Sequence, residues 1–91
     1  MKNQIVLFTM KGCSHCLEFK KMLKKNKTKF TELDIDDNKE EYEMFVEITK
    51  NEYVPAFMIV DEDSKNIEFF APDRDYEDLD QALKIISDKL S

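Results

Sequence analysis

The sequence predicts an α/β fold in which a mixed four-stranded sheet is flanked by three helices. Apolar, β-branched segments alternate with amphipathic segments of helical period, which gives the order β-α-β-α-β-β-α. Helices between the early strands favour parallel pairing, whereas a short turn between the last two strands favours an antiparallel hairpin. The chain has 91 residues, and we expect one domain over residues 1–91.

The first strand is expected over residues 4–9, where apolar residues run almost without interruption, as in strands buried on both faces. Residues 10–12 end it. A helix is then predicted from residue 13 to about residue 26, with lysines mostly outside its apolar stripe. That stripe consists of Cys16, Phe19, Met22 and Leu23.

A second strand is expected over residues 29–36, because apolar and polar residues alternate there. Asp37 followed by Glu40 resembles a helix-start signal, and a second helix is predicted from there to about Asn51. The apolar positions of these two elements are Phe30, Leu33 and Ile35 in the strand, and Tyr42, Phe45, Ile48 and Thr49 in the helix.

The third strand is expected over residues 54–60 and opens with Pro55. Residues 61–64 form a turn, and residues 66–71 pair back as an antiparallel strand. After Pro72, Asp75 is predicted to cap the last helix. The core face of this helix is expected to contain Leu79, Ala82, Leu83, Ile86 and Leu90.

The two cysteines of the chain, Cys13 and Cys16, are separated by only two residues. They cannot link distant parts of the fold, so a structural disulfide explains them poorly. A structural zinc site would need a second pair of ligands, and the single histidine, His15, lies inside the motif. We therefore expect no metal site and interpret the pair as a redox couple.

The position of Cys13 at a strand-to-helix junction predicts that it is the nucleophile. Unpaired N–H groups and the helix dipole favour a thiolate there, and the thiolate is the form that attacks disulfides. Cys16, one turn later on the apolar stripe, is predicted to be the buried resolving thiol. A charged His15 or Lys11 would also support the thiolate, and Lys11 would alternatively meet an anionic substrate group. The alternative for both is a solvated side chain without a role.

The Cys-Ser-His-Cys motif at residues 13–16, the Val54-Pro55 pair before a later strand and the element order together resemble the glutaredoxin branch of the thioredoxin superfamily. The resemblance covers nearly the whole chain and implies a thioredoxin (glutaredoxin-like) fold. It also implies a cis bond before Pro55, with the backbone of Val54 pairing with the substrate. A trans proline at a strand end is the alternative. Ser14 and His15 replace the family's proline and tyrosine, and a histidine there is more like the disulfide isomerases and oxidases.

A departure from the family's pattern bears on the substrate. Glutaredoxins usually carry a Gly-Gly pair before the last helix, where glutathione rests, and this chain has Arg74-Asp75 in that place. Glu77 and Asp78 then resemble the family's acidic continuation. The side chains at the former glycines would either obstruct glutathione or let Arg74 hold its carboxylate.

The resemblance implies an enzyme, a thiol–disulfide oxidoreductase that reduces protein or glutathione mixed disulfides. Its partners would be disulfide-containing proteins, with glutathione or a thioredoxin-type reductase recycling the pair and no permanently bound cofactor. Alternatives are exchange independent of glutathione, as in thioredoxins or disulfide isomerases, and an interaction or redox-sensing module. A further alternative is a carrier in which two chains and glutathione hold a [2Fe–2S] cluster, which would colour the purified protein.

The formal net charge of −6 is unevenly distributed along the chain. Residues 11–29 contain seven lysines and one glutamate, and residues 31–80 contain eighteen acidic and four basic residues. The lysines indicate a solvated helix face or a docking surface for an acidic partner, but no nucleic-acid site, because no aromatic residues are interleaved with them.

The first apolar run is too short for a signal peptide, and none approaches the ~20 residues of a membrane span. We expect a monomer in the cytoplasm that binds no membrane.

Overall fold

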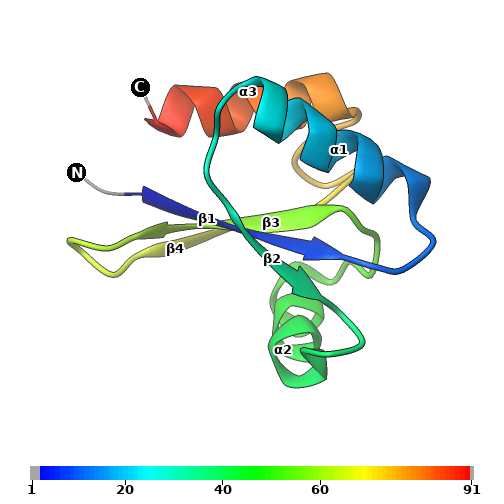
Figure 1. The fold of residues 1–91 in the computed structure, drawn as a ribbon. Helices are drawn as coiled ribbons and strands as arrows, with labels where there is room; N and C mark the ends of the chain where they lie inside the picture. Colours follow the sequence, from blue (N-terminus) through cyan, green and yellow to red (C-terminus); the bar gives the residue numbers. More distant parts are fainter. Residues whose placement is uncertain (1–2, 91) are drawn as a thin grey trace.

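The computed structural model describes residues 3–90, and this part of the chain forms a mixed sheet with helices on both faces (Figure 1). Along the sheet the strands lie in the order β2-β1-β3-β4; β1 and β2 are parallel, and the other neighbours are antiparallel. This confirms the predicted fold class. The elements are β1 (Asn3–Thr9), α1 (Ser14–Lys25), β2 (Thr31–Asp34), α2 (Lys39–Thr49), β3 (Ala56–Asp61), β4 (Ile67–Phe70) and α3 (Leu79–Leu90).

Two hydrophobic cores lie on the two faces of the sheet. Helices α1 and α3 cover one face, and α2 covers the other (Figure 1). Because successive side chains of a strand point to opposite faces, β1 and β3 contribute to both cores. The first core buries Ile5, Leu7, Phe19, Leu23, Phe57, Ile59, Tyr76, Ala82 and Ile86, and the second buries Phe8, Phe45, Ala56 and Ala71.

Strand pairing brings two distant segments together at one end of the sheet. β1 ends at Thr9 and leads into α1, and β3 begins just after Pro55. Since β1 and β3 are antiparallel, with Phe8 opposite Ala56, the end of β1 lies beside the start of β3. The Cys13 segment is thereby placed next to the Val54-Pro55 pair.

Three predictions for the middle of the chain need correction. β2 is shorter than residues 29–36, because the chain turns after Asp34, whose carboxylate accepts a hydrogen bond from the N–H of Asp36 at 2.8 Å. α2 begins after Asn38 and not at Asp37. Ile48 was expected in the core but is 49% exposed, since the buried stripe of α2 runs through Phe45 and Thr49 and Ile48 lies to one side of it.

The prediction that Asp75 caps the last helix is wrong. Asp78 takes that place, and its carboxylate accepts a hydrogen bond from the N–H of Gln81 at 2.9 Å. The carboxylate of Asp75 instead accepts from the N–H of Ala71 at 2.9 Å and from Arg74 at 2.6 Å. A longer loop therefore precedes α3 than the sequence suggested.

The core face expected for the last helix is confirmed for the residues whose side chains the structure describes. Ala82 and Ile86 are buried, and Leu79 and Leu83 pack against them. The side chain of Leu90 lies outside the described part of the chain. Within residues 3–90, no helix combines the length and the apolar character that crossing a bilayer would require.

Candidate active site

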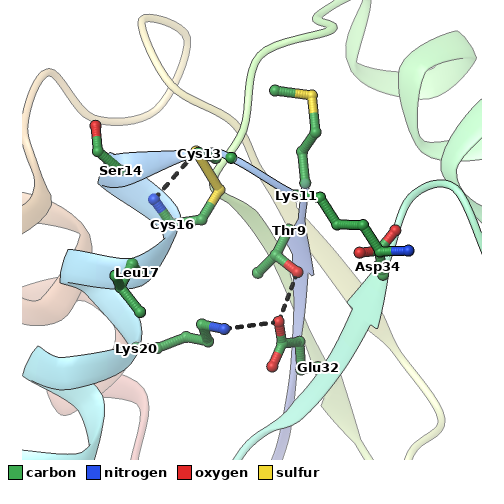
Figure 2. A pocket seen from close by; sticks show the side chains of 11 residues that line it. Thr9, Lys11, Cys13, Ser14, Cys16, Leu17, Lys20, Glu32 and Asp34 are labelled. Atoms are coloured by element: carbon green, nitrogen blue, oxygen red, sulfur yellow. Dashed lines mark hydrogen bonds and ion pairs between the residues drawn. A yellow bond between two sulfur atoms is a disulfide. The ribbon is translucent and has the colours of Figure 1, made fainter.

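Cys13 and Cys16 form a disulfide at the start of α1, with their Cα atoms 5.3 Å apart (Figure 2). Cys13 is the N-cap residue, and its Sγ accepts a hydrogen bond from the N–H of Cys16 at 3.1 Å. Cys13 is partly exposed, whereas Cys16 is only 2% exposed. The two cysteines therefore differ in access to solvent, and the sulfur of the more accessible Cys13 accepts a backbone hydrogen bond.

The turn between β1 and α1 fixes the position of Cys13. Gly12 has a φ of +78°, a conformation that glycine adopts without a steric cost. The N–H of Cys13 donates to the carbonyl of Met10 at 3.2 Å, and its own carbonyl accepts from the N–H of Leu17 at 3.2 Å. The backbone thus turns sharply from the strand into the helix, and the Cys13 sulfur lies over the first helical turn.

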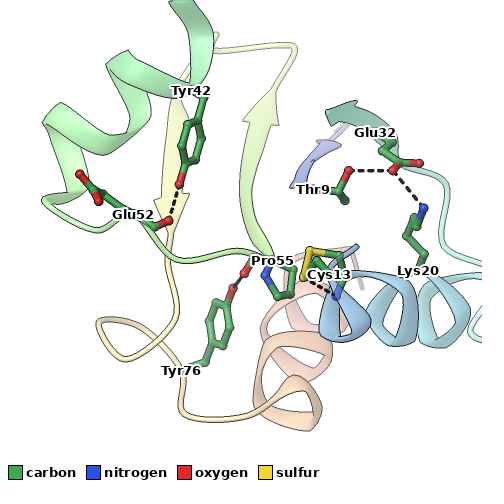
Figure 3. The surroundings of a disulfide bond; sticks show 9 residues. Thr9, Cys13, Lys20, Glu32, Tyr42, Glu52, Pro55 and Tyr76 are labelled. Atoms are coloured by element: carbon green, nitrogen blue, oxygen red, sulfur yellow. Dashed lines mark hydrogen bonds and ion pairs between the residues drawn. A yellow bond between two sulfur atoms is a disulfide. The ribbon is translucent and has the colours of Figure 1, made fainter. Parts of the chain in front are cut away.

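The bond between Val54 and Pro55 is cis, as predicted. Figure 3 shows the buried Pro55 beside Cys13. Its carbonyl accepts a hydrogen bond from the hydroxyl of Tyr76 at 2.5 Å. Tyr76 is 5% exposed, and its ring stacks on Phe57 at 5.6 Å between centroids. Burial raises the pKa of the Tyr76 hydroxyl, which therefore remains a hydrogen-bond donor.

A pocket of about 470 Å³ opens on the side of the disulfide that faces β2 (Figure 2). Three polar side chains that line it form a hydrogen-bonded group. The buried Thr9 hydroxyl donates to Oε2 of Glu32 at 2.7 Å, and Nζ of Lys20 approaches the same oxygen to 3.0 Å. The bond from Thr9, together with the Lys20 ammonium, holds the pKa of the Glu32 carboxyl below its usual value. Residues from β1, β2 and α1 thus meet beneath the cysteines.

A second groove, of about 390 Å³, lies between α1 and the loop that precedes α3. Its lining is apolar at the cis proline and charged around it. The apolar lining residues are Met22, Val54, Pro55, Pro72, Tyr76 and Leu79; the charged or titratable ones are His15, Glu18, Glu77, Asp78 and Asp80. The two pockets flank the active-site motif on opposite sides.

The sequence of this chain is also similar to that of a known protein family. Residues 5–64 match the protein-family model described as glutaredoxin. The chain belongs to the glutaredoxin family. It is a thiol–disulfide oxidoreductase, and its cysteine pair is Cys13 and Cys16.

Solved structures support the same fold for this glutaredoxin-family chain. The solution structure of glutaredoxin from Brucella melitensis superposes with a TM-score of 0.54 and is 15% identical in sequence. The similarity covers 93% of this chain and 79% of that one. No curated protein sequence matches the chain.

The predicted site residues of this glutaredoxin fall into three places. His15, Val54, Pro55, Glu77 and Asp78 come together in the second groove. Lys11 and Ser14, both exposed, line the first pocket with the cysteines. Arg74 and Asp75 line neither of them.

The structure shows the partners of Arg74 and Asp75, and the expectation that they obstruct or hold glutathione stays a prediction. The Arg74 guanidinium donates to the carbonyl of Phe69 at 3.1 Å and pairs with Asp75 inside its own loop. The glycine positions of the family are thus occupied by side chains that bond to one another and do not line the second groove.

Several residues of this glutaredoxin site were not predicted from the sequence. A buried tyrosine in an acidic loop is a signal that could have indicated Tyr76, since an aromatic residue there needs an apolar partner. Nothing in the sequence marks the others, which are Thr9, Glu18, Lys20, Glu32 and Asp80. Within residues 3–90, no group of three or more His, Cys, Asp or Glu side chains is placed to hold a metal ion.

Proposed function

We propose that this protein is a dithiol reductase that acts on protein disulfides and on glutathione mixed disulfides. The observation that carries the proposal is the unequal environment of the two sulfurs. Cys13 is the partly exposed N-cap whose sulfur accepts an N–H bond, and Cys16 is buried behind it. A thiolate is favoured at the first position, and a thiol that reacts second is protected at the other.

The reaction follows from these positions. The Cys13 thiolate attacks one sulfur of the substrate disulfide, and the other sulfur leaves as a thiolate that takes a proton from solvent. Cys16 then loses its proton to solvent and attacks Sγ of Cys13, which releases the second substrate sulfur. The substrate gains two electrons and two protons, and the Cys13–Cys16 disulfide forms.

The substrate chain would lie beside the cis proline. Pro55 lies beside Cys13 (Figure 3), and the backbone groups of Val54, the residue before it, support pairing with an extended segment of the substrate. Met10 and Leu17, 44% and 51% exposed, lie next to the motif and offer apolar contacts that suit a polypeptide. One chain supplies the redox pair and both pockets, which supports action as a monomer. A reducing cytoplasm would keep the pair in its dithiol form.

Turnover assays with paired substrates and donors test this function. A glutathionylated peptide and a protein disulfide are each offered with glutathione and its reductase, or with a thioredoxin-type reductase, and oxidation of NADPH is followed. We expect multiple turnovers that disappear in Cys13→Ser. A preference for one pairing identifies the donor. Stoichiometric reduction without turnover in every pairing would contradict the proposal and indicate a redox-sensing module.

A further inference from the structure

We infer that the groove between α1 and α3 selects a cationic polypeptide segment as the substrate that carries the disulfide. This inference rests on the proposed function and names its substrate class. Val54 and Pro55 line the groove, and Pro55 lies beside Cys13 (Figure 3), so a chain that pairs with Val54 contacts the groove. Its apolar lining includes the buried Pro55 and Tyr76, which can contact the stems of long side chains.

The charges around this apolar lining have one sign. Glu18, Glu77, Asp78 and Asp80 line the groove, and all four are exposed. Neither lysine nor arginine is among the residues that line it, and the one basic group is the imidazole of His15. Exposed carboxylates are ionised at neutral pH, so the groove presents a local negative field.

Two basic side chains of the molecule are engaged outside the groove. The Lys20 ammonium pairs with Glu32 at 3.0 Å in the other pocket. The Arg74 guanidinium pairs with Asp75 and the carbonyl of Phe69 within its loop. Neither cation lines the groove, so the carboxylates of Glu18, Glu77 and Asp80 meet no lysine or arginine in its lining. The carboxylate of Asp78 caps α3 and adds its negative charge to the same lining.

The field discriminates between the two substrates considered above. A glutathionyl group carries two carboxylates and one ammonium, so its net charge is negative and the groove repels it. A polypeptide with lysine or arginine beside its cysteine places positive charge against the carboxylates and aliphatic stems against Pro55 and Tyr76. Charge complementarity of this kind raises association rates by 10- to 1,000-fold at low salt.

A set of matched peptides tests the inference. Each has one central cysteine joined by a disulfide to thiopyridine, a neutral leaving group, and differs only in having lysine, glutamine or glutamate beside the cysteine. Glutathione joined to the same leaving group is a fourth probe. Reduced wild-type protein is mixed with each, release of thiopyridone is followed, and each rate is divided by that of the same probe with dithiothreitol.

We expect the lysine peptide to react roughly tenfold faster than the glutamate peptide, with the difference shrinking as salt rises. Replacing Glu18→Gln and Glu77→Gln together should remove most of this preference. The control is Glu43→Gln with Glu47→Gln, two exposed carboxylates of α2 on the other face of the sheet, which change the net charge equally. It should keep the preference.

Equal rates for the three peptides would overturn the inference, as would a glutathione probe that reacts as fast as the lysine peptide. An equal loss of preference in the control pair would do so too, because the net charge and not the groove would then be responsible. If no probe reacts, the proposed function fails instead. The charge preference of the groove is then tested by binding alone. Fluorescence anisotropy measures the affinities of labelled lysine and glutamate peptides for the double variant Cys13→Ser, Cys16→Ser, and equal affinities would refute the inference.

Discussion

At the scale of single residues, the position of Cys13 sets its chemistry. Its sulfur accepts the N–H of Cys16 at 3.1 Å at the end of the helix where the dipole is positive. This donor belongs to the backbone of α1, so its position is fixed by the helix and not by a mobile side chain. His15 and Lys11 are exposed, so solvent screens their effect on the sulfur. The backbone, more than the side chains, should therefore stabilise the thiolate.

We predict that the pKa of the Cys13 thiol in the reduced protein lies below the free-cysteine value of about 8.5, within the ~3.5–7.5 range seen at helix N-termini. Ultraviolet absorbance of the thiolate against pH measures it, with Cys16→Ser leaving a single thiol. His15→Ala should raise this pKa only modestly. A value at or above that of free cysteine would show that the N-cap position does not activate the sulfur.

Glu32 offers a second prediction at this scale. The hydroxyl of Thr9 is the leading cause of the lowered pKa of Glu32, so Thr9→Val should raise that pKa. Carbon-detected NMR titration of the Glu32 carboxyl measures it. A carboxyl whose pKa is lowered by folding stabilises the fold above its unfolded pKa and loses this contribution as the pH falls through its folded pKa. The free energy of unfolding of Thr9→Val should accordingly fall less than that of the wild type as the pH is lowered.

The control for this prediction is Lys24→Gln, which removes another exposed lysine of α1 that does not contact Glu32. It should leave the pKa of Glu32 unchanged. A pKa that does not move in Thr9→Val, or moves equally in both variants, would mean that general charge and not the hydrogen bond controls this carboxyl.

At the scale of elements, one hydrogen bond joins the loop before α3 to the start of β3. The Tyr76 hydroxyl donates to the carbonyl of Pro55, and both residues are buried. Tyr76→Phe keeps the ring stacked on Phe57 but leaves that carbonyl without this donor. We expect a loss of about 1–2 kcal/mol in the free energy of unfolding, measured in urea.

Tyr53→Phe is the matched control, because Tyr53 is 64% exposed and its loss of a hydroxyl should change stability by less than about 0.5 kcal/mol. Equal effects of the two substitutions would contradict the role given to Tyr76. Since Pro55 also borders the groove, Tyr76→Phe should slow disulfide reduction as well.

The order of the elements was predictable from the sequence, but their ends were not. β1 has an almost continuous run of apolar residues, and α1 has a regular apolar stripe. Both patterns arise because these residues are buried, so the sequence alone indicates them. The start of α3 was misplaced because Asp73, Asp75 and Asp78 are all good caps. The N–H of Ala71 donates to the Asp75 carboxylate within the loop, so Asp75 is engaged there and does not cap the helix.

Some features of the active site were likewise predictable from the sequence, and others were not. A short motif carries Cys13 and Cys16, and the cis bond before Pro55 followed from the family resemblance. The contact between Thr9 and Glu32 depends on the register of β1 against β2, which neither strand specifies alone. The acidic groove likewise needs α1 and α3 to be packed on the same face of the sheet.

At the scale of the whole molecule, the uneven charge of the sequence becomes an arrangement around the active site. The molecule carries a formal charge of −6, yet α1 presents lysines along much of its exposed surface. The groove at the start of the same helix is lined by carboxylates. The redox pair lies at the end of the sheet where β1 leads into α1, and residues of its motif line both pockets, so substrate access and sulfur chemistry share one end of the fold.

The central claim is that Cys13 attacks the substrate and Cys16 resolves the intermediate. Mass spectrometry of two variants, each reduced and then mixed with a disulfide-containing peptide, tests it most directly. Cys16→Ser should accumulate as a covalent adduct through Cys13, because the resolving thiol is missing. Cys13→Ser should form no such adduct at the same time, because the buried Cys16 cannot reach the substrate. Adduct formation by Cys13→Ser and not by Cys16→Ser would reverse the roles and contradict the account.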